Sequence, residues 1–212
     1  MTHPAYETLR AVTPQASVLL QANPGPMTLD GTNTWLLRAP DAGEVIVVDP
    51  GQQDERHLDA LLAAAPKIAL VLVTHGHFDH SEAAAQVHER TAAPVRAIDP
   101  GHCRDGPPLV DGELLDAAGI RLRVLATPGH TADSASFLVG SGDAVLTGDT
   151  ILGRGSTVVA HPDGNLSQYL DSLHRLHELG DAIVLTGHGP ELPHLGEAAE
   201  FYLAHRAERL DQ

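Results

Sequence analysis

The segment LVTHGHFDH, residues 72–80, closes an apolar run with three histidines and one aspartate in six positions. The run itself, Ile68–Thr74, is short and aliphatic, which predicts a strand buried on both faces. A helical pattern begins at Glu82, two residues after the last histidine. Imidazole and carboxylate groups are ligands for zinc and other transition metals. The chain must therefore fold so that a strand end and a helix start surround a ligating cluster.

The spacing inside this segment suits two metal ions. His75 and His77 are two residues apart, so in an extended loop both rings point the same way and reach one ion. Asp79 and His80 follow where the chain turns into the helix, and they can face a second ion beside the first. These ligand types suit zinc, and also iron or manganese. One four-ligand segment cannot complete two sites, so further ligands must come from elsewhere.

Four other loops repeat the same arrangement. Each follows a predicted strand and turns with Pro or Gly: DPG at 49–51, TPGHT at 127–131, TGDT at 147–150 and TGHG at 186–189. Loops at strand ends commonly carry the functional side chains of a fold. The ligands that these loops offer are His130, Asp149 and His188.

Strands and helices alternate along the chain. Predicted strands are Ser17–Gln21, Thr34–Arg38, Glu44–Asp49, Ile68–Thr74, Arg121–Ala126, Ser134–Val139, Ala144–Thr147 and Ala182–Thr186. Predicted helices are Arg56–Ala65, Glu82–Arg90, Leu166–Leu179 and Glu197–Arg209, the third with Asn165 as its N-cap. Apolar strands between helices indicate an α/β architecture with functional loops at one edge of a sheet.

The seven ligand positions, in this order, resemble the metallo-β-lactamase superfamily over nearly the whole chain. The resemblance implies one four-layer αββα sandwich domain over residues 1–212 and a dinuclear metal-dependent hydrolase that attacks with a metal-bound hydroxide. It implies that His75, His77 and His130 hold the first metal, that Asp79, His80 and His188 hold the second, and that Asp149 bridges both. The expected metals are two zinc ions, with iron or manganese as alternatives. Asp79 is also the expected catalytic residue, accepting a hydrogen bond that orients the hydroxide.

The segments outside the ligands favour one branch of the superfamily. NPGPMTLDGTNTWLL at Asn23–Leu37 and GDTILGRGSTVV at Gly148–Val159 resemble the lactamase-like endoribonucleases, although that branch continues into a winged-helix-like region beyond this sequence. A phosphodiesterase is therefore the first expectation. The alternatives are a thioester or ester hydrolase resembling hydroxyacylglutathione hydrolase, an iron-dependent persulfide oxygenase and a non-catalytic metal-binding scaffold. Because Asp149 stands where the best-known zinc β-lactamases have cysteine, we expect negligible β-lactam hydrolysis. The expected substrate-binding residues are Asn33, Gly155, Ser156 and Thr157.

Charge restricts the partners. Lys and Arg number 13 against 28 Asp and Glu, a formal net charge of −15. Few cations are available for phosphates, which argues against tight RNA binding. Two metal ions would still attract anions locally, so the expected partner is a small anionic substrate or single-stranded RNA. One cysteine, an N-terminus that does not resemble a signal peptide and the lack of a long apolar run predict a cytoplasmic protein without a membrane span.

Eight of the nine remaining histidines are predicted to be solvated helix or loop residues. They are His3, His57, His88, His102, His174, His177, His194 and His205. The predicted C-terminal helix is amphipathic, with its apolar face made by Ala199, Tyr202, Leu203, Ala207 and Leu210.

Overall fold

A computed structural model describes residues 5–210, without the side chain of Leu210, and contains two mixed β-sheets. His3 therefore lies outside the described residues. The first sheet has the order β1-β2-β3-β4-β5-β6 and the second the order β11-β10-β9-β8-β7. The first comprises β1 Arg10–Ala11, β2 Ala16–Leu20, β3 Asn33–Leu37, β4 Val45–Val48, β5 Ile68–Leu72 and β6 Val95–Arg96. The second comprises β7 Leu114–Ala117, β8 Ile120–Ala126, β9 Ala135–Val139, β10 Ala144–Gly148 and β11 Ile183–Thr186.

The parallel pairs bring the ends of several strands to one edge. Strand β4 pairs in parallel with β5, and β5 with β6. In the second sheet β10 pairs in parallel with β11, and the other pairs are antiparallel. Parallel neighbours end at the same edge, so the loops after β4, β5, β10 and β11 meet there.

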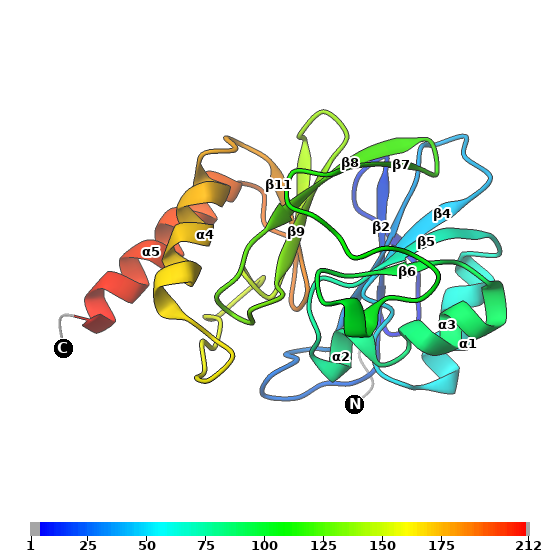
Figure 1. The fold of residues 1–212 in the computed structure, drawn as a ribbon, viewed down its shortest axis with the longest axis horizontal. Helices are drawn as coiled ribbons and strands as arrows, with labels where there is room; N and C mark the ends of the chain where they lie inside the picture. The colour runs from blue at the N-terminus through cyan, green and yellow to red at the C-terminus, as the bar shows by residue number, and fades with distance from the viewer. Residues whose placement is uncertain (1–4, 211–212) are drawn as a thin grey trace.

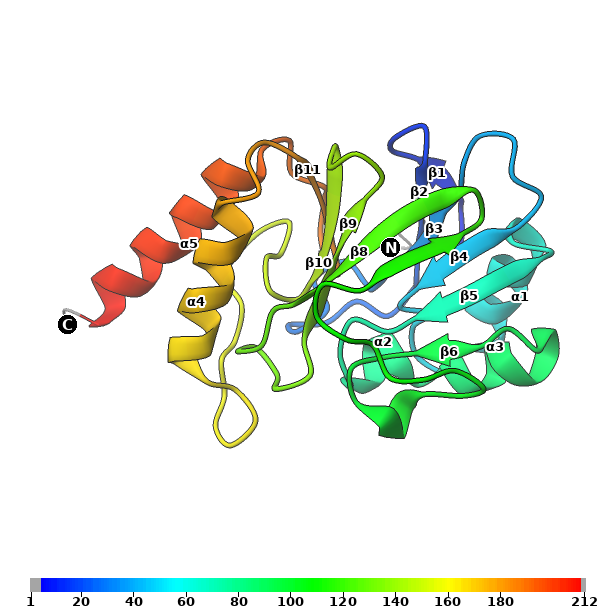
Figure 2. The same cartoon turned by 45° about the horizontal axis from the view of Figure 1, so that its top comes forward.

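Helices cover the outer face of each sheet, which makes four layers (Figures 1 and 2). On the first sheet lie α1 Glu55–Ala64 and α3 Ala84–Thr91, and on the second lie α4 Leu166–His177 and α5 Leu195–Leu210. The short helices α2 Phe78–Ser81 and η1 Pro100–His102 lie in the connections on the α1 side. The structure thus has the predicted αββα sandwich. Among the described residues, no helix combines the length and apolar character that crossing a bilayer requires.

Burial on both faces explains the unbroken apolar strands. In β4, Ile46 and Val48 face the core between the sheets, whereas Val45 and Val47 face the helix layer. The period of two along a strand sends alternate side chains to opposite faces, so both faces of such a strand must be apolar.

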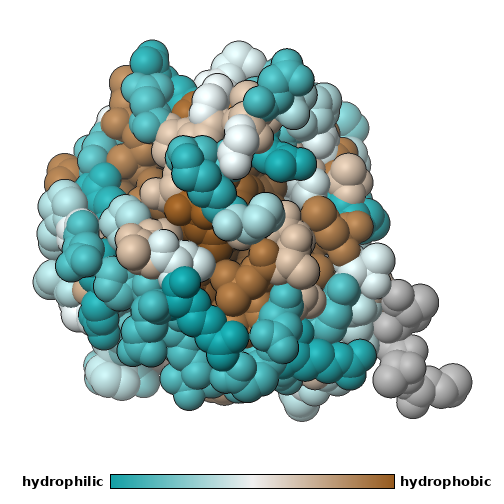
Figure 3. All heavy atoms as spheres, turned by 90° about the vertical axis from the view of Figure 1, so that its right-hand side faces the viewer, coloured by the Kyte–Doolittle hydropathy of each residue, from teal (hydrophilic) through white to brown (hydrophobic). Residues whose placement is uncertain are grey.

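The outer surface at the α1 and α3 end is mostly hydrophilic around an apolar hollow (Figure 3).

All eight predicted strands are present, with ends shifted by one or two residues. The predicted helices are present as α1, α3, α4 and α5, and the Asn165 side chain accepts from the Gln168 N–H as an N-cap. The sequence prediction missed β1, β6, β7, α2 and η1. In α5, Ala199 and Tyr202 are buried and Leu203 is half-buried, but Ala207 is exposed, because the end of this helix projects beyond the second sheet.

Candidate metal centre

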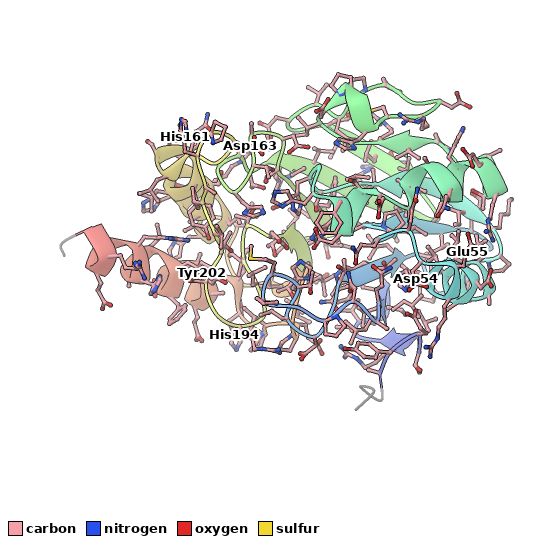
Figure 4. The ribbon with its side chains drawn as sticks, turned by 90° about the horizontal axis from the view of Figure 1, so that it is seen from below. Asp54, Glu55, His161, Asp163, His194 and Tyr202 are labelled. Carbon is pink, nitrogen blue, oxygen red and sulfur yellow. The ribbon has the colours of Figure 1, made fainter. Side chains whose placement is uncertain are left out.

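The predicted ligands meet where the strands end. The turn after β5 carries His75 and His77, and α2 then places Asp79 and His80 on the following helical turn. Asp149 follows β10, and His188 follows β11. Figure 4 looks onto this edge, with Asp54 and Glu55 at the start of α1 on one side and His161, Asp163, His194 and Tyr202 on the other.

The seven side chains form two adjacent groups, and the ligand atoms within each group lie within 4.8 Å of one another. One group is His75, His77, His130 and Asp149, and the other is Asp79, His80 and His188. In the first, His77 Nδ1 lies 3.0 Å from His75 Nε2 and 3.1 Å from His130 Nε2. In the second, His188 Nε2 lies 3.1 Å from both His80 Nε2 and Asp79 Oδ2. Ligands arranged tetrahedrally at about 2.0–2.1 Å from one zinc ion lie at similar distances from one another.

Asp149 lies between the two groups. Its Oδ1 is 3.5 Å from His80 Nε2, and its Oδ2 is 3.5 Å from His188 Nε2 and 3.7 Å from His130 Nε2. The Oδ1 atom is buried and has no hydrogen-bond partner among the described residues. A buried carboxylate oxygen without a partner is costly, and a cation at this point would satisfy it.

The outer nitrogens of four histidines determine which ring nitrogen faces the centre. His80 Nδ1 donates to Asp49 Oδ2 at 2.8 Å, His130 Nδ1 to the Val158 carbonyl at 2.7 Å, and His188 Nδ1 to the Gly31 carbonyl at 3.0 Å. Because the Thr74 hydroxyl donates to Asp49, its oxygen accepts from His75 Nδ1 at 3.0 Å. In each neutral ring the Nε2 lone pair therefore points inward, as metal coordination requires.

Asp49 orients ligands of both groups. One carboxylate oxygen accepts from the Thr74 N–H, and the other accepts from the Thr74 hydroxyl and from His80. Through Thr74 it also orients His75. The sequence analysis noted the DPG loop but assigned Asp49 no role, because its contact with His80 spans 31 residues.

Burial and charge favour neutral rings for His75 and His77 and favour positive charge around Asp149 and His188. Burial, with His80 nearby, lowers the pKa of His75 well below its ordinary value, and burial with His130 lowers that of His77. Burial lowers the pKa of His188, but Asp149 and Asp79 outweigh it and raise the value to about 10. Burial opposes ionisation of Asp149, but His80 and His188 hold the pKa of this carboxyl well below its usual range. The donor set and the unpartnered oxygen thus fit two divalent cations.

The predicted substrate residues fall into two classes. The Asn33 amide is buried and donates to the carbonyls of Thr186 and Gly189, and the Thr157 hydroxyl is buried and donates to the Asp149 carbonyl. Both therefore hold loops that carry ligands. Gly155 and Ser156 are exposed, and their contact with substrate stays a prediction.

His57 corrects the prediction that the other histidines are solvated. Its side chain is 1% exposed and lies between Glu7 and Thr34. Its position on the inner side of α1 turns it toward the first sheet, which the surrounding helix sequence did not reveal. His174 is exposed, as predicted.

Exposed apolar side chains lie close in sequence to the predicted ligands or to residues that orient them. Phe78 follows His77 and is 61% exposed, Met27 lies four residues before Gly31 and is 61% exposed, and Val158, whose carbonyl orients His130, is 47% exposed. A cavity of about 270 Å³ beside His77 is acidic, with Asp99, Asp133 and Asp163 in its lining.

Comparison with known proteins gives one family. The sequence profile of the Metallo-beta-lactamase superfamily matches residues 27–188. An Aspergillus fumigatus protein described as an atrochrysone carboxyl ACP thioesterase is 32% identical over 93% of this chain, which spans 63% of that relative's length.

Solved structures with similar folds support the same family assignment. A metallo-beta-lactamase family protein from Thermus thermophilus has a TM-score of 0.82 at 26% identity, covering 95% of this chain and 82% of its own. A structure described as a di-iron-bound form has a TM-score of 0.64 at 28% identity, covering 86% of this chain and 95% of its own.

Proposed function

The chain belongs to the metallo-β-lactamase superfamily, and from this premise we propose that it is a dinuclear metal-dependent hydrolase of thioesters. The observation that carries the substrate class is the 32% identity, over 93% of the chain, to a relative described as a thioesterase. We therefore favour the thioester alternative over the phosphodiester that the sequence analysis placed first. Zinc is the proposed metal, with iron and manganese as alternatives.

The surroundings of the ligands support this choice. Met27, Phe78 and Val158 present apolar surface suited to an acyl group. The carboxylates of Asp99, Asp133 and Asp163 beside His77 disfavour the anionic phosphodiester backbone of RNA. The net charge of −15 acts in the same direction.

The roles of the residues follow from their contacts. His75, His77 and His130 would hold one ion, Asp79, His80 and His188 the other, and Asp149 both. Bound divalent ions lower the pKa of water toward about 7 and polarise a carbonyl. Burial raises the pKa of Asp79, but its hydrogen bond with His188 and the nearby charges of His80 and His188 together outweigh burial and lower the pKa, so Asp79 is ionised at neutral pH. An ionised Asp79 can accept a hydrogen bond from the attacking water and orient it.

Hydrolysis rates on substrates of different chemical classes test the proposal. Purified protein of measured metal content is assayed with an N-acetylcysteamine thioester of an aromatic acid, bis-p-nitrophenyl phosphate, single-stranded RNA and nitrocefin. We expect kcat/KM for the thioester to exceed the others at least 100-fold, and Asp79→Asn to lower it while His174→Ala does not.

Two results would contradict the thioesterase proposal. Faster cleavage of the phosphodiester or of RNA would restore the endoribonuclease-like hypothesis. A protein that holds two metal ions and hydrolyses none of the four would place its substrate elsewhere in the superfamily.

A further inference from the structure

A buried chain of hydrogen bonds connects the N-terminal segment with Asp49. Glu7 Oε2 lies 2.6 Å from His57 Nδ1, and His57 Nε2 lies 2.9 Å from Thr34 Oγ1. The Thr34 hydroxyl donates to the Asp49 carbonyl at 2.7 Å. The exposed fractions of the side chains are 8% for Glu7 and 1% for His57, and Thr34 is fully buried.

The direction of each hydrogen bond follows from the donors available. Thr34 has one hydroxyl proton, and the Asp49 carbonyl can only accept it. The Thr34 oxygen must then accept from His57, so His57 Nε2 carries a proton. His57 Nδ1 faces a carboxylate at 2.6 Å, so a second proton lies between His57 and Glu7. One arrangement satisfies all three bonds, which leaves the His57 ring a single orientation.

The order carboxylate, imidazole, hydroxyl also occurs in hydrolytic triads. Here the hydroxyl cannot reach a substrate, because Thr34 is fully buried and its proton is donated to the backbone. The chain of bonds can therefore act only on what it holds, which is the backbone of Asp49.

Asp49 needs such support. Its φ is +54°, a left-handed conformation that is strained in a residue other than glycine. In this conformation its N–H donates to the Leu72 carbonyl, and its carboxylate faces Thr74 and His80. Rotation of the Asp49 backbone would withdraw the carboxylate from both.

We propose that Glu7, His57 and Thr34 are positioning residues that hold Asp49 in place and thereby set the metal affinity of His75 and His80. The inference rests on the metal centre of the proposed function, and it is independent of which substrate is hydrolysed. Among the described residues, no hydrogen bond or ion pair joins the side chain of any of the three to a predicted ligand, so their effect reaches the centre through Asp49.

We call the hydrogen-bonded residues Glu7, His57 and Thr34 the array. Zinc affinity, measured by competition with a chromophoric chelator, tests whether the array acts on the metal centre. Thr34→Val keeps the side-chain shape and removes both hydrogen bonds of the hydroxyl. We expect it to weaken zinc binding about 10- to 100-fold, the usual effect of removing an outer hydrogen bond at a metal site. Thr34→Ser restores the hydroxyl and should bind zinc within about twofold of wild type.

Further variants separate positioning from stability. Glu7→Gln, at the far end of the array, should weaken zinc binding in the same direction and serves if Thr34→Val does not fold. His174→Ala removes an exposed histidine and should leave affinity unchanged. The melting temperature of each metal-free variant is measured alongside.

Wild-type zinc affinity in folded Thr34→Val and Glu7→Gln, even with a lower melting temperature, would overturn the proposal. So would a wild-type protein that binds no zinc. Tight zinc binding without thioester hydrolysis would contradict the proposed function alone and leave the array standing.

Discussion

Hydrogen bonds to protein groups orient individual side chains at the metal centre. His130 and His188 donate to backbone carbonyls, and His80 donates to Asp49. Each bond leaves one ring nitrogen directed inward. Such preorganisation lowers the conformational entropy that binding must overcome, since the rings have little freedom left to lose.

Asp149 should matter more for metal content than any single histidine. Its carboxylate lies within 3.7 Å of ring nitrogens from both groups, so Asp149→Ala would remove a ligand from both, whereas His77→Ala would remove a ligand from one. We expect Asp149→Ala to retain less than half of the metal that His77→Ala retains after dialysis, by elemental analysis. Circular dichroism checks that each variant is folded. Stoichiometric metal in Asp149→Ala would show that it does not bridge.

Residue types and local spacing predict the clustered side chains of the centre but not the residues that support them. His75, His77, Asp79 and His80 are recognisable because one turn holds them all. Asp49 and His57 gain their roles from partners 31 and 50 residues away, respectively. An isolated helix sequence contains nothing that separates a buried His57 from an exposed His174.

At the scale of elements, close approach of a loop to a helix positions His130. Gly129 has a φ of +136°, and a Cβ there would lie 2.3 Å from the Tyr169 Cα in α4. The Asn165 N–H, at the start of α4, donates to the Gly129 carbonyl. The loop can therefore dock on α4 only with glycine at this position.

Gly129→Ala should be severely destabilising. The clash is with backbone and cannot be relieved by a side-chain rotation, so we expect a loss of roughly 3 kcal/mol or more in the free energy of unfolding. Gly196→Ala in α5 is the control, because nothing lies within 4 Å of its added Cβ. It should be neutral or stabilising by up to about 1 kcal/mol. Urea unfolding of the metal-free proteins measures both, and equal stability of the two would refute the clash.

Hydrophobic patterning predicts the long elements and fails for the short ones. Among the predicted strands, β4 and β5 are continuous apolar runs and β8 alternates apolar with charged residues, but β1 and β6 have two residues each, too few for any period to show. In β7, Leu114 is exposed and Leu115 buried, so an apolar pair marks an edge strand instead of a core strand. The fold class was predictable because it depends on the longer elements.

The charge of the whole molecule and the charge of the centre act in opposite directions. The chain has a net charge of −15, and the cavity beside His77 contains the carboxylates of Asp133 and Asp163. Two divalent ions would attract an anion over a short range. The partner expected from the sequence, a small anionic substrate or single-stranded RNA, would therefore meet repulsion before attraction.

Ionic strength should separate these two effects. The Debye length falls from about 30 Å at 0.01 M salt to about 8 Å at 0.15 M, so added salt screens the long-range repulsion and leaves contacts at the centre largely unchanged. We expect kcat/KM for a coenzyme A thioester, which is polyanionic, to rise several-fold over this range with kcat nearly constant. The kcat/KM for the same acyl group on neutral N-acetylcysteamine should change by less than twofold.

A double variant tests the acidic surface directly. Asp133→Asn combined with Asp163→Asn should raise kcat/KM for the coenzyme A thioester at low salt and flatten its salt dependence. A coenzyme A rate that falls as salt is added would mean that the positive centre, and not the acidic surface, governs the approach of the substrate.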